Sequence, residues 1–309
     1  MTSSVLKNST GQDTGVAPER EAPKKTVKIC AVVVTYNRKD LLKRCLDGIM
    51  NQSYPVSHIL IVDNASTDGT VEMLKEEYAG LELLALSENT GGAGGFHAGF
   101  KRAAQIDCNL IWVMDDDALP SEGATKALAD FYDGKNALVN PSLPYEKKGE
   151  VAASEPVEEE FGIFVGMALP RTLVEKIGYP HAHYFIYHDD LEYSFRIHKA
   201  GSKILRLPYG PIYHADMKKV PREDVNILGR KVSVPEQPSW KLYYDYRNLV
   251  FRRAEHEGYV GAKFKAVKVI VLGALLKIFG KEKHQEKAAM ISKAGIDALL
   301  GRSGRRVTP

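Results

Sequence analysis

The chain has 309 residues, of which 44% are hydrophobic and 26% are charged, a composition typical of one large globular domain with an appendage. The formal net charge of +3 is too small to indicate a nucleic-acid partner, and we expect none. The cysteines show neither paired nor metal-ligand spacing, which favours a reducing cytoplasm over a disulfide framework (Cys30, Cys45 and Cys108).

The N-terminal residues carry no secretory signal pattern. Residues 1–25 are polar and lack periodicity, so we predict a disordered tail there and structure from Thr26 onward. The longest apolar run, at 267–279, is interrupted by Lys268 and Lys277 and is too short to span a bilayer. We therefore expect a cytoplasmic protein that is either free or peripheral at a membrane surface.

Strand and helix patterns alternate strictly from residue 26 onward. Strands are predicted over 27–34, 59–62, 81–86 and 111–114, and helices over 40–49, capped by Asp40, 71–78 and 96–104. This alternation predicts an open, mostly parallel α/β sheet. Ligands of such sheets bind at the carboxyl ends of the strands, and polar residues follow those ends at 35–38 and at Asp63 and Asn64.

Three consecutive aspartates follow the fourth strand (Asp115, Asp116 and Asp117). Adjacent carboxylates repel one another, so a folded chain tolerates them where a multivalent cation or a dense set of donors offsets the charge. If the backbone stays extended, Asp115 and Asp117 project to the same side and can bind one Mg²⁺ or Mn²⁺, which would hold a diphosphate. A solvated turn rich in Asp is the alternative.

A glycine cluster occupies residues 91–95 as GGAGG. It lacks the Lys-Ser/Thr of a phosphate-binding loop and does not follow the first strand with dinucleotide-binding spacing, which excludes an ATPase or an NAD enzyme. The two remaining interpretations are a flexible turn and a close approach of backbone amides to a sugar or diphosphate.

The second half of the chain carries a second acidic cluster. After a polar and acidic surface excursion at 140–160, we predict a strand over 161–169, a helix over 171–177, and a helix that begins at Asp189, Asp190 and Glu192 and ends at Gly201. A strand at 203–207 then leads to His214. Acids in a first helical turn also suit the helix dipole, and a single His is more often structural than a ligand.

From about residue 235 the chain becomes aromatic and basic. Helices are predicted from there, with residues 301–309 frayed. Apolar residues recur at helical spacing between lysines (Phe264, Val267, Ile270, Val271, Leu275, Ile278 and Phe279). Such a helix either lies in an anionic lipid interface or packs on the main domain or a second subunit. We therefore divide the chain into a tail (1–25), an α/β domain (26–235) and a helical region (236–309).

Four motifs, in this order, resemble those of family 2 inverting glycosyltransferases of the GT-A fold. They are VVVTYNR at 32–38, VDNASTDGT at 62–70, the triple Asp, and Asp189-Asp190-Leu191-Glu192 before Arg196. The resemblance covers about residues 25–216. ENTGGAGGF at 88–96 and the triple Asp are most similar to bacterial galactofuranosyltransferases, while YYDYRN at 243–248 is similar to related rhamnosyltransferases.

The resemblance implies roles for individual residues. Asp190 would be the general base, with Asp189 in place of the commoner Glu before it. Because a base must be ionised at neutral pH, we expect a donor to Asp190, such as Arg196 or the helix N-terminus. The implied metal ligands are Asp115, Asp117 and His214, and the residues around the nucleotide are Thr35, Asn37, Arg38, Asp63, Asn89, Gly91, Gly92 and Asp116.

The activity implied by the resemblance is a metal-dependent transfer of galactofuranose from UDP-galactofuranose to a glycan or polyprenyl-diphosphate-linked acceptor, in cell-surface polysaccharide synthesis. We expect this at the inner face of the cell membrane, and also consider a homo-oligomer. A rhamnosyltransferase using dTDP-rhamnose and a non-catalytic sugar-nucleotide-binding subunit are alternatives. A nucleotidyltransferase would be expected to carry a Gly-rich Arg/Lys signature at 35–38, which this chain lacks.

Overall fold

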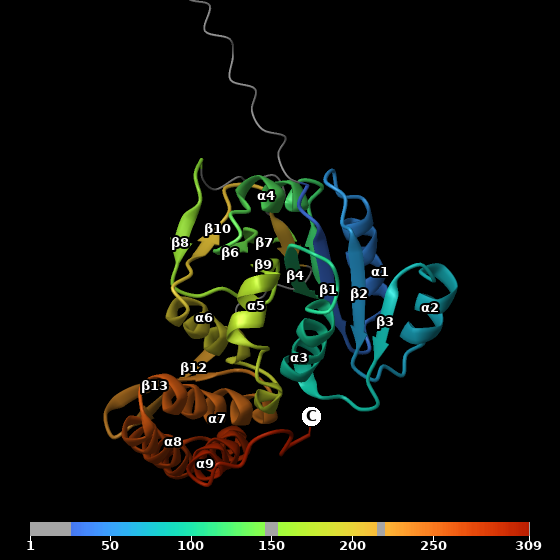
Figure 1. Ribbon diagram of the computed structural model, residues 1–309. Coiled ribbons are helices and arrows are strands. Elements are labelled where there is room, and N and C mark those ends of the chain that lie inside the picture. Colours follow the sequence, from blue (N-terminus) through green and yellow to red (C-terminus); the bar gives the residue numbers. More distant parts are fainter. Residues whose placement is uncertain (1–25, 146–153, 215–219, 309) are drawn as a thin grey trace, which may run out of the picture.

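The structure of the chain is a computed structural model that describes residues 26–145, 154–214 and 220–308. Within these ranges an α/β domain sits above a layer of C-terminal helices (Figure 1). The tail predicted at 1–25 and part of the excursion at 140–160 lie outside the described residues.

Eight of the described strands form one open sheet in the order β3-β2-β1-β4-β9-β6-β10-β8. The first four are parallel neighbours: β1 (Ile29–Thr35), β2 (His58–Asp63), β3 (Glu82–Ala85) and β4 (Leu110–Asp115). The other half of the sheet is mixed: β9 (Met167–Pro170) is antiparallel to β4 and to β6 (Ala137–Val139), β10 (Ile204–Arg206) is parallel to β6, and β8 (Val157–Glu159) is antiparallel to β10. The predicted open, mostly parallel α/β sheet is confirmed.

Helices cover both faces of this sheet, which explains why β1 is apolar along its length. Alternate residues of a strand point to opposite faces. Ile29, Ala31 and Val33 pack on one side with α1 (Lys39–Met50), α2 (Thr70–Glu77) and α4 (Ala124–Phe131). Cys30, Val32 and Val34 pack on the other with α3 (Gly91–Ala103), α5 (Arg171–Ile177) and α6 (Asp189–Lys199).

Smaller elements complete the described chain. A second sheet has the order β5-β11-β7, formed by β5 (Ala118–Pro120), β11 (Ile212–His214) and β7 (Ser142–Pro144). A hairpin of β12 (Arg222–Ile227) and β13 (Arg230–Pro235) leads to α7 (Ser239–His256), α8 (Tyr259–Phe279) and α9 (Gln285–Leu299). Short 3-10 turns are η2 (Ala182–Tyr184) and η3 (Glu282–His284).

The residues after α9 are held by α7 and by the segment before α6, so the prediction that they fray is wrong for 301–308. Gly304 donates its N–H to the His183 carbonyl at 2.8 Å, and the Tyr244 hydroxyl donates to the Val307 carbonyl at 2.8 Å. The buried Arg247 donates to the Gly304 carbonyl at 2.6 Å. These partners are distant in the sequence, so no local pattern announces them.

The structure differs from the prediction at the start of α1 and at the start of the strand predicted over 161–169, each for a local reason. Arg38 occupies the N-cap of α1, where its side chain makes no capping hydrogen bond to the helix, and Asp40 lies inside the first turn, so Asp40 is not the cap. The strand predicted at 161–169 is reduced to β9, because Gly166 adopts φ +78° and breaks the extended chain just before Met167.

Helix α3 begins at Gly91, so the glycine cluster is part of a helix and not a flexible turn, which was one of its two interpretations. Gly91 has φ +74°, and a Cβ there would overlap the Phe185 carbonyl. Gly95 faces β1, where a Cβ would lie 2.5 Å from Val34 Cγ1. The glycines therefore allow the helix to approach both the sheet and the segment that precedes α6.

Replacing Gly91 with alanine is expected to destabilise the protein. The positive φ alone costs about 1–3 kcal/mol for a residue with a Cβ, and the overlap with Phe185 adds to that cost. Thermal or urea unfolding of Gly91→Ala measures the loss. Gly92→Ala is the matched control, because a Cβ at Gly92 meets open space. Equal stability of the two variants would contradict the packing argument.

Candidate active site

Two adjoining cavities lie at the carboxyl edge of the parallel strands. The first, of about 520 Å³, is lined by the ends of β1 and β4, by Asn89 and by Trp240 and Lys241 of α7. The second, of about 530 Å³, is lined by Phe164 and by the start of α6. Both volumes suit a small-molecule ligand. The cavities share Gly92, Asp115, Ile186 and Tyr187.

The triple Asp forms a turn in the wall of the first cavity, not the extended segment that we expected. β4 ends at Asp115, and β5 begins at Ala118. Asp116 is buried and accepts hydrogen bonds from the Thr35 hydroxyl at 2.8 Å and from Arg38 at 3.2 Å. Arg38 also pairs with Asp117 at 3.2 Å. The positive charge of the Arg38 guanidinium thus partly neutralises the negative charges of the Asp116 and Asp117 carboxylates.

Asp115 has no such partner among the contacts of the described residues. Burial, and then the charges of Asp117, Asp116 and Asp189, raise the pKa of Asp115 well above its ordinary value. Its carboxylate form therefore needs an additional positive charge, which a divalent cation would provide.

His214 lies beside this acidic turn. The antiparallel pairing of β11 with β5 sets His214 opposite Ala118, the neighbour of Asp117. Its Nε2 is buried without a hydrogen-bond partner. Burial lowers the pKa of His214, and the Asp117 charge opposes this only in part. A neutral imidazole with a free lone pair next to a carboxylate fits a divalent cation.

The three predicted metal ligands are nevertheless not drawn tightly together. In the described part of the chain, the ligand atoms of Asp115, Asp117 and His214 do not all lie within 4.8 Å of one another. Asp117 is engaged by Arg38 instead. Binding of a cation by all three residues therefore requires their side chains to move closer together.

Two predicted nucleotide residues support the wall of the first cavity without lining it. Asn37, at φ 53°, accepts the Thr67 N–H at 2.7 Å and so joins the segments after β1 and β2. Asp63 accepts the Ser66 N–H at 3.1 Å, while its Oδ1 is buried without a partner. By contrast, six of the predicted residues line this cavity (Thr35, Arg38, Asn89, Gly91, Gly92 and Asp116).

Asn64 is a residue of this wall to which the motifs assigned no role. Its Oδ1 accepts the Thr90 N–H at 2.9 Å, and its Nδ2 donates to the Gly91 carbonyl at 2.9 Å. It therefore fixes the start of α3 to the end of β2. The feature of the sequence that could have indicated this role is the position of Asn64 directly after a buried strand.

Asp189 and Asp190 open α6 in the second cavity, together with Asp115. Burial and the neighbouring Asp190 charge raise the pKa of Asp189 to about 8. Burial also raises the pKa of Asp190, but the Leu191 N–H, which donates to Asp190 at 2.7 Å, opposes the shift. The helix N-terminus thus supplies the predicted donor. Arg196 does not, because it pairs with Glu192 at 2.7 Å.

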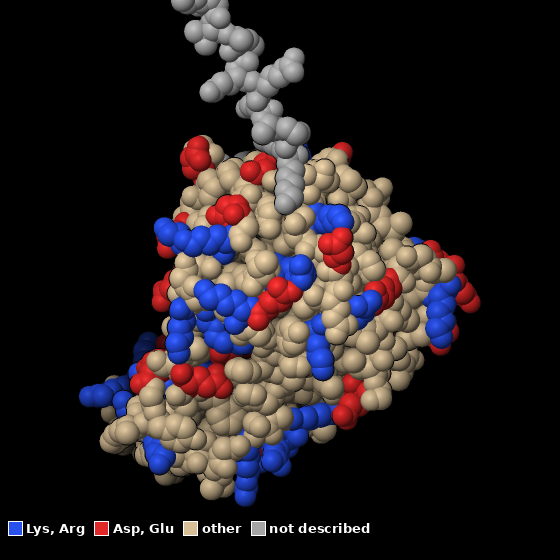
Figure 2. Space-filling model, viewed as in Figure 1, with Lys and Arg blue, Asp and Glu red and all other residues tan. Residues whose placement is uncertain are grey.

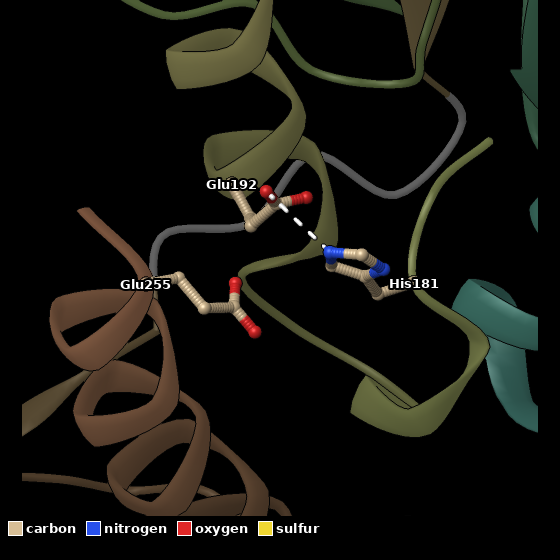
Figure 3. Close-up of side chains that lie close together, drawn as sticks. All are labelled: His181, Glu192 and Glu255. Carbon is tan, nitrogen blue, oxygen red and sulfur yellow. Dashed lines mark ion pairs between the residues drawn. The ribbon is translucent and has the colours of Figure 1, made fainter. Parts of the chain in front are cut away.

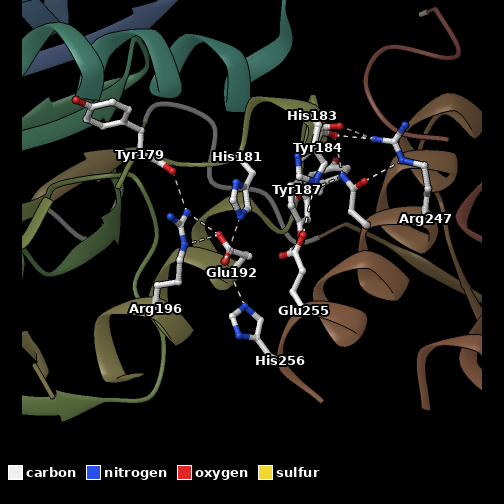
Figure 4. A network of polar contacts seen from close by, with 11 residues as sticks. Tyr179, His181, His183, Tyr184, Tyr187, Glu192, Arg196, Arg247, Glu255 and His256 are labelled. Atoms are coloured by element: carbon white, nitrogen blue, oxygen red, sulfur yellow. Dashed lines mark hydrogen bonds and ion pairs between the residues drawn. The ribbon is translucent and has the colours of Figure 1, made fainter. Parts of the chain in front are cut away.

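The segment before these acids is held by two buried residues of α7 (Figure 4). Asn248 donates through Nδ2 to the carbonyls of Tyr184, Ile186 and Tyr187 at 2.8, 2.7 and 3.0 Å. Arg247 donates to the Tyr184 carbonyl at 3.0 Å. Positive φ angles at Phe185, Tyr187 and His188 show that this path is strained and needs support. The aromatic motif at 243–248 drew attention to this part of α7, but it did not predict that Arg247 and Asn248 hold the backbone before α6.

A C-terminal arginine packs against two residues that line the first cavity, Asn89 and Phe185. Arg305 donates to the Asn89 carbonyl at 3.4 Å, and its guanidinium carbon lies 5.8 Å from the centre of the Phe185 ring. With Arg38 and Lys241, Arg305 adds positive charge around a cavity that also carries the triple Asp.

Comparison with known proteins identifies the family. Residues 30–193 match the model of "Glycosyl transferase family 2". The chain belongs to glycosyl transferase family 2. This family 2 member is 26% identical over 253 residues to galactofuranosyltransferase GlfT1 of Mycolicibacterium smegmatis, with 72% of the chain and 82% of the relative covered.

Solved structures share its fold. TarS 1–349 of S. aureus superposes with a TM-score of 0.56 at 17% identity, covering 89% of this chain and 82% of TarS. A mannosyltransferase of Pyrobaculum calidifontis, in complex with GDP-Man and Mn²⁺, gives a TM-score of 0.54 at 18% identity, covering 91% and 89%. The predicted family and GT-A fold of the family 2 member are thus confirmed.

Proposed function

We propose that this protein transfers galactofuranose from UDP-galactofuranose to a glycan or polyprenyl-diphosphate-linked acceptor, with inversion at the anomeric carbon. The observation that carries the proposal is that Asp115 and Asp190, which come from distant parts of the sequence, line one cavity. The similarity to galactofuranosyltransferase GlfT1 over most of both chains supports the choice of sugar.

The two cavities suit the two halves of the reaction. A divalent cation, Mn²⁺ or Mg²⁺, held by Asp115, Asp117 and His214 would supply charge neutralisation of the leaving diphosphate. Thr35 and Arg38 orient Asp116 at the base of the first cavity. Arg38, when it leaves Asp117, presents its guanidinium to a phosphate.

The acceptor hydroxyl would enter the second cavity beside Asp190. The Oδ1 atom of Asp190 accepts the Leu191 N–H, so its Oδ2 atom remains to take the proton of the acceptor hydroxyl. Attack from the face opposite the diphosphate is a single displacement and inverts the configuration. Burial and the Asp190 charge raise the pKa of Asp189, which disfavours its carboxylate form and makes it less suited to this role.

A screen of donor hydrolysis across sugar nucleotides tests the choice of sugar. UDP-galactofuranose is expected to be turned over fastest, and dTDP-rhamnose, UDP-glucose and GDP-mannose more slowly. The motif shared with rhamnosyltransferases does not favour dTDP-rhamnose, because its Arg247 and Asn248 bind backbone carbonyls. Fastest turnover of another donor would replace galactofuranose in the proposal without affecting the proposed acids.

We further propose that α8 binds an anionic membrane surface. The helix packs on α9 and α7, and its buried residues are Ala262, Ala266, Val269, Gly273 and Leu276. Among the described residues, no helix has the length and apolar character needed to span a bilayer. The other side of α8 leaves large apolar residues exposed, including Phe264 at 68% and Ile278 at 71% (the others are Val260, Val267 and Val271). Exposed lysines flank them, and Figure 2 shows the C-terminal helices as tan surface bordered by blue. This arrangement suits an anionic interface.

Replacing both Phe264 and Ile278 with aspartate is expected to weaken binding to anionic vesicles on the order of 10²–10⁴-fold, because each large apolar side chain contributes about 1.5–3 kcal/mol when fully buried. Leu228→Asp, at an exposed residue of the β12–β13 turn, is the control. Unchanged flotation would refute the membrane proposal. Conversion of a dimer to a monomer instead would assign the apolar stripe to a second copy of the chain.

A further inference from the structure

We propose that His181, Glu192 and Glu255 bind a first-row transition metal ion such as Zn²⁺, at a site separate from the triple Asp. This inference goes beyond the proposed transferase activity. The three residues come from the segment before η2, from α6 and from α7, and their side chains converge in Figure 3. One ligand atom from each lies within 4.8 Å of the others.

Two further histidines adjoin these ligands. His256 Nε2 lies 3.2 Å from Glu192 Oε1, and His183 Nε2 lies 3.6 Å from Glu255 Oε1. His181 Nε2 lies 3.8 Å from Glu192 Oε1. Ligand atoms around a tetrahedral Zn²⁺ are about 3.4 Å apart, given bonds of about 2.0–2.1 Å. The observed separations therefore lie close to those of a metal site before an ion enters.

Each carboxylate is held through one oxygen by Arg196 or Tyr184, and its other oxygen contacts a histidine, with His256 Nε2 hydrogen-bonded to Glu192 Oε1 at 3.2 Å and His183 Nε2 3.6 Å from Glu255 Oε1. Arg196 occupies Glu192 Oε2 with two donors at 2.7 and 3.0 Å, and the Tyr184 hydroxyl donates to Glu255 Oε2 at 2.9 Å (Figure 4). The Oε1 atoms of Glu192 and Glu255 face the histidines. Arg196 and Tyr184 thus orient both carboxylates, as outer partners of metal ligands commonly do.

The donor set suits a first-row transition metal ion. The Glu192 side chain is only 1% exposed and is contacted by Arg196, His256 and His181, so a buried carboxylate is directed at the histidine nitrogens. Neutral imidazoles with carboxylates are ligands for Zn²⁺ and its neighbours, whereas Mg²⁺ and Ca²⁺ prefer oxygen alone.

An ion at this site would join three parts of the fold. His181 begins the segment that leads through Tyr184 to Asp189 and Asp190, Glu192 lies on the same helix as the acids, and Glu255 lies near the end of α7. The ion would therefore brace the strained path before the proposed base against the C-terminal helices.

The experiment uses the untagged full chain carrying Asp115→Asn and Asp117→Asn, which removes the proposed donor-site ligands. Co²⁺ is the probe, because tetrahedral Co²⁺ gives visible d–d absorption. We expect one equivalent of Co²⁺ to bind, Zn²⁺ to displace it, and Zn²⁺ to raise the melting temperature. Adding His181→Ala or Glu255→Gln should weaken binding at least ten-fold. His198→Ala, at a half-buried histidine of α6 that contacts the Glu160 carbonyl, should leave Co²⁺ binding unchanged.

Absence of Co²⁺ absorption in the parent variant would overturn the proposal, as would undiminished binding in both His181→Ala and Glu255→Gln. Both substituted side chains are partly exposed, and circular dichroism establishes that each variant folds. Because two ligand variants are tested, the proposal can still be judged if one of them does not fold. None of these measurements depends on sugar transfer, so their failure is distinguishable from failure of the proposed function.

Discussion

Asp190→Asn is expected to reduce sugar transfer by roughly 10²–10⁴-fold, the contribution of a positioned general base. The amide keeps the shape of the side chain and can still accept the Leu191 N–H, so the start of α6 should not move. It cannot accept the proton of an acceptor hydroxyl. Affinity for UDP and for Mn²⁺ should stay within a few-fold of the parent, because Asp190 lines the second cavity and not the first. Steady-state kinetics and calorimetric titration of UDP separate the two effects.

Asp189→Asn is the matched comparison, because Asp189 adjoins Asp190 and is buried more deeply. The raised pKa of Asp189 means that it loses its proton only as the pH rises towards about 8. If Asp189 were the base, the rate would therefore climb across that range, and Asp189→Asn would cause the larger loss. A rate that rises towards pH 8, together with a larger loss in Asp189→Asn, would assign the role of general base to Asp189 instead of Asp190. Retained turnover in both variants would remove the acidic pair from the mechanism.

Asp115→Asn is expected to abolish Mn²⁺-dependent binding of UDP. A cation that neutralises a diphosphate contributes several kcal/mol, so the loss should be on the order of 10³-fold in transfer rate. Titration of UDP with and without Mn²⁺ measures the coupling directly. Asp107→Asn is the control, because Asp107 is an exposed acid that pairs with Lys28. Unchanged metal-dependent affinity in Asp115→Asn would refute the ligand assignment.

Stability provides an independent check on that variant. The fold raises the pKa of Asp115, so the native state binds its proton more tightly than the unfolded chain does. Ionisation of Asp115 consequently lowers the free energy of unfolding as the pH rises above the unfolded-state pKa. Asn cannot ionise, so metal-free Asp115→Asn should be at least as stable as the parent at pH 8. A marked loss of stability would show that Asp115 is a structural residue.

The sequence predicted the features that depend on local order. The alternation of apolar strands and amphipathic helices predicted the parallel half of the sheet, and each acidic cluster lies at the predicted end of a strand or start of a helix. Strand ends of a parallel sheet share one edge, so Thr35, Arg38 and Asp116 could be expected together. The structure confirms that they meet.

What escaped prediction depends on contacts between distant residues. Gly91 and Gly95 look like a flexible turn until Phe185 and Val34 are seen against them. Arg247 appears as one basic residue in an aromatic stretch, yet it is buried against backbone carbonyls of another segment. The proposed ligands His181, Glu192 and Glu255 lack a recognisable spacing, because they converge from three separate segments.

The contact between Arg305 and Asn89 has a consequence for biosynthesis. The wall of the first cavity includes Asn89 near the middle of the α/β domain, but Asn89 is contacted by Arg305, which the ribosome adds 216 residues later. A nascent chain that ends before residue 300 has all four strands of the parallel half and the triple Asp, yet lacks Gly304 and Arg305. Such a nascent chain should therefore hold a sugar nucleotide poorly, and occupancy should rise once these two residues have been added and have packed.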